Sequence, residues 1–103
     1  MFMSNYEERD IGVAYVHEKL EQGYYRVISE DGRNDCLRPP ASVQWCIGDK
    51  GRLVYYTDKN TYGLTKFVPD NSVEIDFDKL VNNYNSKWNA NISISKWNGH
   101  LVG

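Results

Sequence analysis

The sequence is poor in the residues that bind metals or form disulfides. Its 103 residues include only two cysteines and two histidines. Cys36 and Cys46 are ten positions apart and do not form a C-x-x-C pair, and His17 and His100 are distant from each other. This spacing is not that of a zinc site, and a reducing compartment keeps such cysteines as separate thiols. We therefore expect no structural metal, no disulfide and no cofactor.

Long apolar runs are also missing. Among the longest is Leu53-Val54-Tyr55-Tyr56, which is far too short to cross a bilayer. Residues 1–10 contain acidic side chains where a secretory signal would place a basic and then an apolar segment. These features predict a soluble, cytoplasmic protein that does not contact membranes.

The chain has no excess of positive charge. Its formal net charge is −2, and the segments 1–22, 23–68 and 69–103 carry −3, +2 and −1. Proteins whose affinity comes from neutralising phosphates are usually basic, so this balance argues against a general nucleic-acid binder. The mildly basic middle segment still permits local contact with nucleic acid.

Signatures of catalysis are absent as well. Gly48-Asp49-Lys50-Gly51 lacks the length and the Ser/Thr of a phosphate-binding loop; it resembles the Gly-Asp-x-Gly turn that precedes a strand in SH3-like barrels. A nucleophilic site would need Cys36 or Cys46 beside a histidine, with an orienting carboxylate such as Asp35. No spacing in the sequence assembles such a set, so we expect a protein that is not an enzyme.

Aromatic residues, by contrast, are abundant. They make up 14% of the chain, and tyrosines occur as adjacent pairs at Tyr24-Tyr25 and Tyr55-Tyr56. Successive side chains on a strand point to opposite faces, so each pair should place one ring in the core and one toward solvent. Exposed tyrosines supply large, rigid contact area with a polar tip, which is typical of binding surfaces.

Short alternating segments, separated by turn signals, predict most of the chain to be β-structure. The turn signals include Asp31-Gly32, which favours a tight hairpin turn. They also include Pro39-Pro40, whose nitrogens carry no hydrogen to donate to a β-ladder. The expected strands are 11–17, 23–29, 34–37, 42–47, 52–57 and 62–68.

The hydrophobic period then changes to that of a helix. Phe77, Leu80, Val81, Tyr84 and Trp88 lie on one face of a helix predicted over 76–88, with Asp76 as its N-cap. We expect the core to contain Trp45, Phe77, Leu80 and Trp88. A last strand near 91–97 is expected before the Asn98-Gly99 turn signal.

These elements predict one α+β domain over residues 11–103, after a flexible N-terminal tail at 1–10. The expected architecture is a small bent antiparallel sheet or an SH3/OB-like barrel, with one C-terminal amphipathic helix.

The expected function is non-enzymatic binding of a protein partner, as an inhibitor or immunity-type protein does. If the strands pair in sequence order, one sheet face carries the partner-binding residues Tyr24, Arg26, Arg52, Tyr56, Tyr62 and Lys66. The same face suits an alternative, a small barrel that stacks single-stranded nucleic acid on its rings. Ten asparagines and eight tyrosines, which have A/T-rich codons, suggest an origin in a mobile genetic element.

Overall fold

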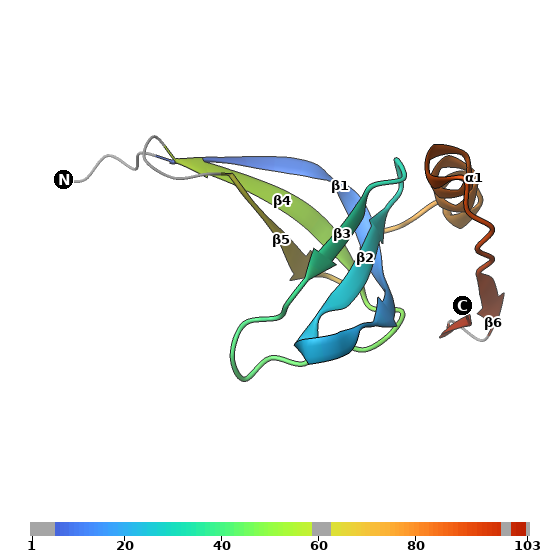
Figure 1. Ribbon diagram of the computed structural model, residues 1–103, viewed down its shortest axis with the longest axis horizontal. Coiled ribbons are helices and arrows are strands. Elements are labelled where there is room, and N and C mark those ends of the chain that lie inside the picture. The colour runs from blue at the N-terminus through green and yellow to red at the C-terminus, as the bar shows by residue number, and fades with distance from the viewer. Residues whose placement is uncertain (1–5, 59–62, 98–99, 103) are drawn as a thin grey trace.

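The computed structural model describes residues 6–58, 63–97 and 100–102, and shows a curled five-stranded antiparallel sheet with one α-helix (Figure 1). The predicted α+β class with a C-terminal helix is therefore confirmed. In chain order the elements are β1 (Tyr6–Lys19), the 3-10 turn η1 (Glu21–Gly23), β2 (Tyr25–Ser29), β3 (Asn34–Leu37), β4 (Lys50–Asp58), β5 (Leu64–Pro69), α1 (Phe77–Trp88), β6 (Ser95–Trp97) and β7 (His100–Val102).

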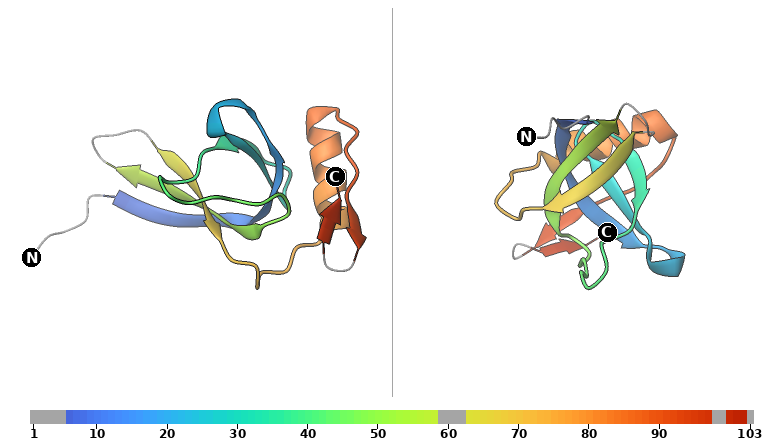
Figure 2. Two further views of the ribbon diagram at one scale, coloured as in Figure 1. Left: turned by 90° about the horizontal axis from the view of Figure 1, so that it is seen from below. Right: turned by 90° about the vertical axis from the view of Figure 1, so that its left-hand side faces the viewer.

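The long strand β1 organises the sheet, whose strand order is β3-β2-β1-β4-β5. The first part of β1 pairs with β4 and its last part pairs with β2, so both halves of the sheet share it. Gly12 lies at a bulge within the part that pairs with β4, with φ of 122°, a conformation that glycine adopts without steric cost. The bend lets the sheet curl, as the end-on view in Figure 2 shows.

The curled sheet is a barrel left open along one side. The edge strands β3 and β5 come close at one end without forming a ladder (Figure 1). We call the gap between these two edges the seam.

Two hydrophobic cores lie on opposite faces of the sheet. The inner core fills the barrel and contains Ala14, Val16, Tyr25, Val27, Trp45, Leu53 and Phe67. The outer core joins the sheet to the helix and the loop before it, and contains Tyr15, Ile28, Val73, Ile75, Phe77, Leu80 and Tyr84. The alternation of β1 and β2 therefore serves both cores, because neighbouring residues point to opposite faces.

The helix α1 closely follows its sequence prediction. Asp76 is its N-cap, and the side chain accepts a hydrogen bond of 3.1 Å from the backbone N–H of Lys79. Phe77 and Leu80 are buried as expected. The expected burial of Trp88 is wrong: it is 48% exposed at the last turn, where its indole N–H donates to the Gly32 carbonyl.

The loop between β2 and β3 holds the helix against the sheet. Glu30 accepts from the backbone N–H of Asp76 and pairs with Lys79, while its carbonyl accepts from the side chain of Asn83. With the bond from Trp88 to Gly32, these contacts fix both ends of α1. None of the helices in the described parts of the chain has the length and apolar character needed to cross a bilayer.

Some predicted boundaries differ from the structure. The strand expected at 42–47 is wrong, since these residues form a loop in which Ser42 has φ of 71°. The following strand β4 is already paired with β1 and β5 on its two sides, so it has no free edge for a hairpin with residues 42–47. Residues 6–10, assigned above to the tail, form the start of β1, and the expected strand at 91–97 is shortened to β6.

Candidate functional site

The first tyrosine pair behaves as its alternation predicts. Tyr25 is buried in the inner core, where its ring centroid lies 5.5 Å from that of Trp45. Tyr24, directly before β2, is 37% exposed. Tyr55 and Tyr56 are both half-buried, so the second pair separates core from surface less sharply.

The structure does not bring the six predicted partner-binding residues onto one face. The strands do not pair in sequence order, because β4 pairs with β1 rather than with β3. Tyr24 and Arg26 therefore lie on one side of β1, while Arg52, Tyr56 and Lys66 lie on the other. Tyr62 lies outside the described residues.

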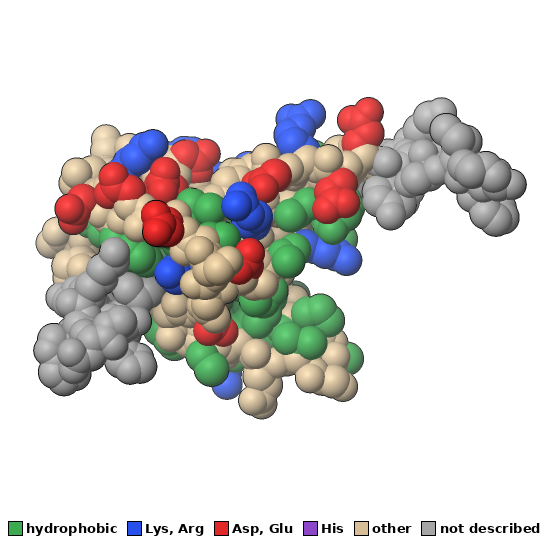
Figure 3. Space-filling model, turned by 180° about the vertical axis from the view of Figure 1, so that it is seen from behind, with side chains coloured by type: hydrophobic (Ala, Val, Ile, Leu, Met, Phe, Trp, Pro, Cys, Tyr) green, Lys and Arg blue, Asp and Glu red, His purple; other side chains and the backbone are tan. Residues whose placement is uncertain are grey.

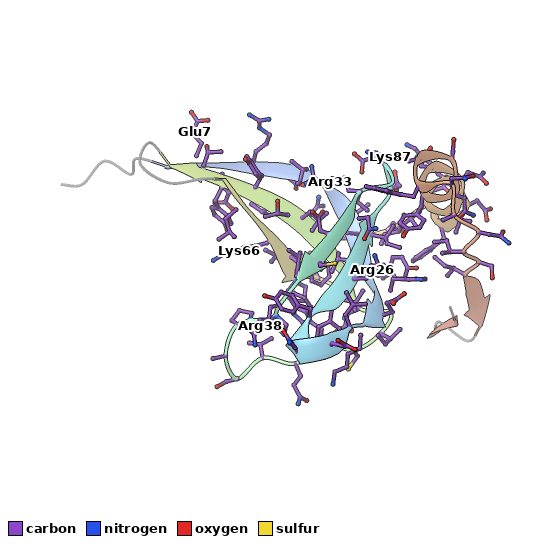
Figure 4. All side chains as sticks on the ribbon, viewed as in Figure 1. Glu7, Arg26, Arg33, Arg38, Lys66 and Lys87 are labelled. Atoms are coloured by element: carbon purple, nitrogen blue, oxygen red, sulfur yellow. The ribbon has the colours of Figure 1, made fainter. Side chains whose placement is uncertain are left out.

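Two of the predicted cations are neutralised within the sheet. Arg26 Nε lies 3.5 Å from a carboxylate oxygen of Glu18, and Arg52 Nη1 lies 3.0 Å from Asp10. Figure 4 shows Arg26 near the part of the sheet that the helix covers. These arginines already have acidic partners, and any ligand phosphate must compete with them.

A groove lies along the seam between the two open edges. Its volume is about 410 Å³, and it receives residues from the end of β3, the loop after it and the edge strand β5. We call it the seam groove, and its lining residues are Tyr24, Cys36, Leu37, Arg38, Pro40, Trp45, Leu64, Thr65, Lys66 and Phe67. A larger, shallower hollow of about 890 Å³ adjoins it and shares Tyr24 and Cys36. We favour the seam groove because aromatic walls enclose it.

Aromatic residues form the base of the seam groove. Trp45 is 5% exposed, and its ring meets that of Phe67 edge to face with centroids 5.1 Å apart. Its indole N–H is buried and has no hydrogen-bond partner among the described residues. An unsatisfied buried donor costs roughly 1–3 kcal/mol, so an acceptor that reached this atom would recover part of that cost.

Two cations at the seam groove lie over tyrosine rings instead of pairing with acids. The guanidinium carbon of Arg38 is 5.2 Å from the ring centroid of Tyr24, and Lys66 Nζ is 5.4 Å from that of Tyr56. Within the described residues neither cation forms an ion pair. Figure 4 labels Lys66 at β5 and Arg38 beyond the end of β3, on the two sides of the seam.

The sequence pattern identified only part of this site. Tyr24 and Lys66, two of the six residues predicted to bind a partner, line the seam groove, and Lys66 lies over the ring of Tyr56. Arg38 and Leu64 were missed, and Trp45 was assigned only to the core. The position of Arg38 directly before Pro39-Pro40, where β3 must end, was the one available signal for an edge site.

A polar network crosses the outer core near the helix. The hydroxyl of Tyr15 hydrogen-bonds His17 Nδ1, and Asn34 bridges Arg26 at 3.0 Å to the hydroxyl of Tyr84 at 3.3 Å. The hydrogen bond from Asn34 on β3 to Tyr84 on α1 connects the sheet to the helix.

Burial controls the titration of this network. It lowers the pKa of His17 below 6.5; nearby Glu18 opposes that shift and Arg26 adds to it. It also raises the pKa of Tyr15 well above 10, and Tyr84 and Glu18 contribute to that rise. Both groups are therefore neutral in the folded protein near pH 7.

The described residues do not assemble a catalytic cysteine site. Cys36 and Cys46 are exposed free thiols, and no described hydrogen bond joins either thiol to a histidine. Asp35, the candidate orienting carboxylate, pairs with Arg33 at 3.3 Å. No group of three or more His, Cys, Asp or Glu side chains suited to a metal occurs in the described part of the chain.

The seam groove is thus a partly apolar surface with two cations and, among the residues that the structure describes, no acidic lining residue. Comparison with models of known protein families, with curated proteins and with solved structures finds no match to this chain.

Proposed function

We propose that this chain is a non-enzymatic binding module that holds a protein partner in the seam groove. The observation that carries the proposal is the combination of aromatic walls with two cations, Arg38 and Lys66, that tyrosine rings position and no described carboxylate neutralises. Aromatic residues and arginine are the residue types that concentrate binding energy at protein interfaces. A compact module of this kind suits an inhibitor or immunity-type role, in which it blocks a larger protein.

The charge arrangement favours a protein over a nucleic acid. Arg26 and Arg52 are paired with carboxylates, which removes two of the cations that a phosphate backbone would use. OB barrels bind oligonucleotides on the face of strands 2 and 3, and here α1 packs beside Ile28 and Asn34 on that face. Figure 3 shows acidic and basic side chains interspersed on the far side of the molecule, without a continuous basic surface there.

Affinity capture from cells in which the protein occurs tests the proposal. The full-length wild type is compared with the charge reversals Arg38→Glu and Lys66→Glu, and with Lys87→Glu on α1 as the matched control. Wild type and Lys87→Glu should retain the same protein, and both groove variants should lose it.

A parallel capture is treated with nuclease before washing. Retention of the partner after treatment is expected, because the contact is protein to protein. A partner that nuclease removes, or one that both groove variants retain, would contradict the proposal.

A further inference from the structure

The two edge strands of the sheet favour an added strand of one direction. Each neighbouring pair in the five-stranded sheet is antiparallel, so β3 and β5 at its two ends run the same way. No described ladder joins them across the seam. A segment laid along β5 in the opposite direction would continue the antiparallel pattern, and it would also run antiparallel to β3.

The edge strand β5 presents an apolar approach to the seam groove. Leu64 is 54% exposed at its start, and Phe67 on the same strand is buried in the inner core. The groove volume of about 410 Å³ lies within the range of roughly 300–1,000 Å³ that is usual for binding pockets. This space fits an apolar side chain carried on an extended backbone.

The cations beside the seam groove indicate which charge the bound segment should carry. Arg38 and Lys66 lie on opposite sides of the seam, over Tyr24 and Tyr56, and the ten lining residues include no aspartate or glutamate. Carboxylates on a bound segment would therefore contact cations and no described carboxylate of the groove. The tyrosine rings already restrict the two cationic side chains, so these side chains lose little further conformational entropy on binding.

We infer that the seam groove binds an extended acidic segment of a partner protein by strand addition to β5. The segment places one apolar side chain against Trp45 and Phe67, and places carboxylates on Arg38 and Lys66. This inference rests on the proposed function and adds the chemistry and the backbone conformation of the partner.

Selection of random peptides displayed on phage against the full chain tests the inference. Selected peptides should share an apolar residue flanked by Asp or Glu. A synthetic peptide of the selected sequence should bind wild type and Lys87→Glu equally, as measured by fluorescence anisotropy. Charge reversal at Arg38 or Lys66 should weaken binding by about tenfold or more.

A second peptide tests the strand geometry. N-methylation of alternate backbone nitrogens removes donors that a β-ladder needs, so it should weaken binding by about tenfold or more in one of the two alternating sets. Equal binding of both methylated sets, selection of peptides without acidic residues, or selection of no peptide would overturn the inference. Tight, salt-dependent binding of a mixed-sequence single-stranded DNA at the same groove residues would overturn it as well.

These results are separable from those for the proposed function. If capture of a protein depends on Arg38 and Lys66 but the peptide experiment fails, the groove binds a protein by other chemistry. If capture does not depend on these residues, the proposed function itself is wrong. Thermal unfolding of each variant confirms that it is folded; both substituted side chains are exposed, so little loss of stability is expected.

Discussion

At the scale of single residues, the same side-chain types have different roles because their neighbours differ. Arg26 and Arg52 are held by carboxylates, whereas Arg38 and Lys66 lie over tyrosine rings. The carboxylates neutralise the positive charges of Arg26 and Arg52 within the sheet. The tyrosine rings leave the positive charges of Arg38 and Lys66 without a described counter-ion.

Two apolar residues of α1, Leu80 and Trp88, differ in burial, and this difference leads to a stability prediction. Leu80 is fully buried, so Leu80→Ala should lower the free energy of unfolding by roughly 2–5 kcal/mol. Trp88→Ala should cost less, because the exposed ring mainly supplies one hydrogen bond to Gly32, worth about 1 kcal/mol. Urea denaturation of both variants measures the difference, and an equal or larger loss for Trp88→Ala would contradict the outer core described here.

His17 should make the stability depend on pH. Burial lowers its folded-state pKa below 6.5, so the unfolded chain binds a proton at a higher pH than the folded chain does. Stability is therefore fully present above about pH 6.5 and falls as the pH drops toward the folded-state pKa. Urea midpoints at about pH 7.5 and about pH 5.5 measure this loss.

The variant His17→Gln is the control for that measurement. Glutamine does not titrate, and its amide oxygen can accept the hydrogen bond from Tyr15. The decrease in stability between the two pH values should be smaller in the variant than in wild type. An identical decrease would show that His17 is not responsible.

At the scale of elements, the strands and the helix were largely predictable, while their pairing was not. Alternation located β1, β2, β4 and β5 approximately, and β3 to the residue, because side-chain period and turn residues are local properties. The pairing of β4 with β1 depends on the length of β1 and the bulge at Gly12, which act over distant parts of the chain. The site at the seam follows from that pairing, so the sequence pattern predicted Tyr24 and Lys66 but not their grouping with Arg38.

The close approach of β4 and β5 at Gly51 gives a prediction about strand pairing. A Cβ atom added to Gly51 would lie 2.2 Å from the carbonyl oxygen of Val68. This oxygen belongs to the backbone, so it cannot rotate away as a side-chain atom could. Gly51→Ala should therefore destabilise the protein by roughly 1–3 kcal/mol, by forcing the two strands apart. A thermal midpoint equal to that of wild type would show that the strands lie farther apart than described.

At the scale of the whole molecule, the two faces of the sheet are used differently. The outer face near β2 and β3 is occupied by α1, whereas no described ladder closes the seam between the edge strands β3 and β5. Figure 2 shows α1 and β6 together at one end of the sheet. The C-terminal elements thus complete the fold at one surface, and none of their described residues lines the seam groove.

The most direct test of this account is photo-crosslinking in cells in which the protein occurs. A photoreactive phenylalanine analogue replaces Leu64 at the seam groove or, as the matched control, Trp88 on α1; both side chains are about half exposed. If the seam groove holds a protein partner, a specific protein adduct should form at position 64 and none at position 88. A nucleic-acid adduct at position 64, or a protein adduct only at position 88, would contradict it.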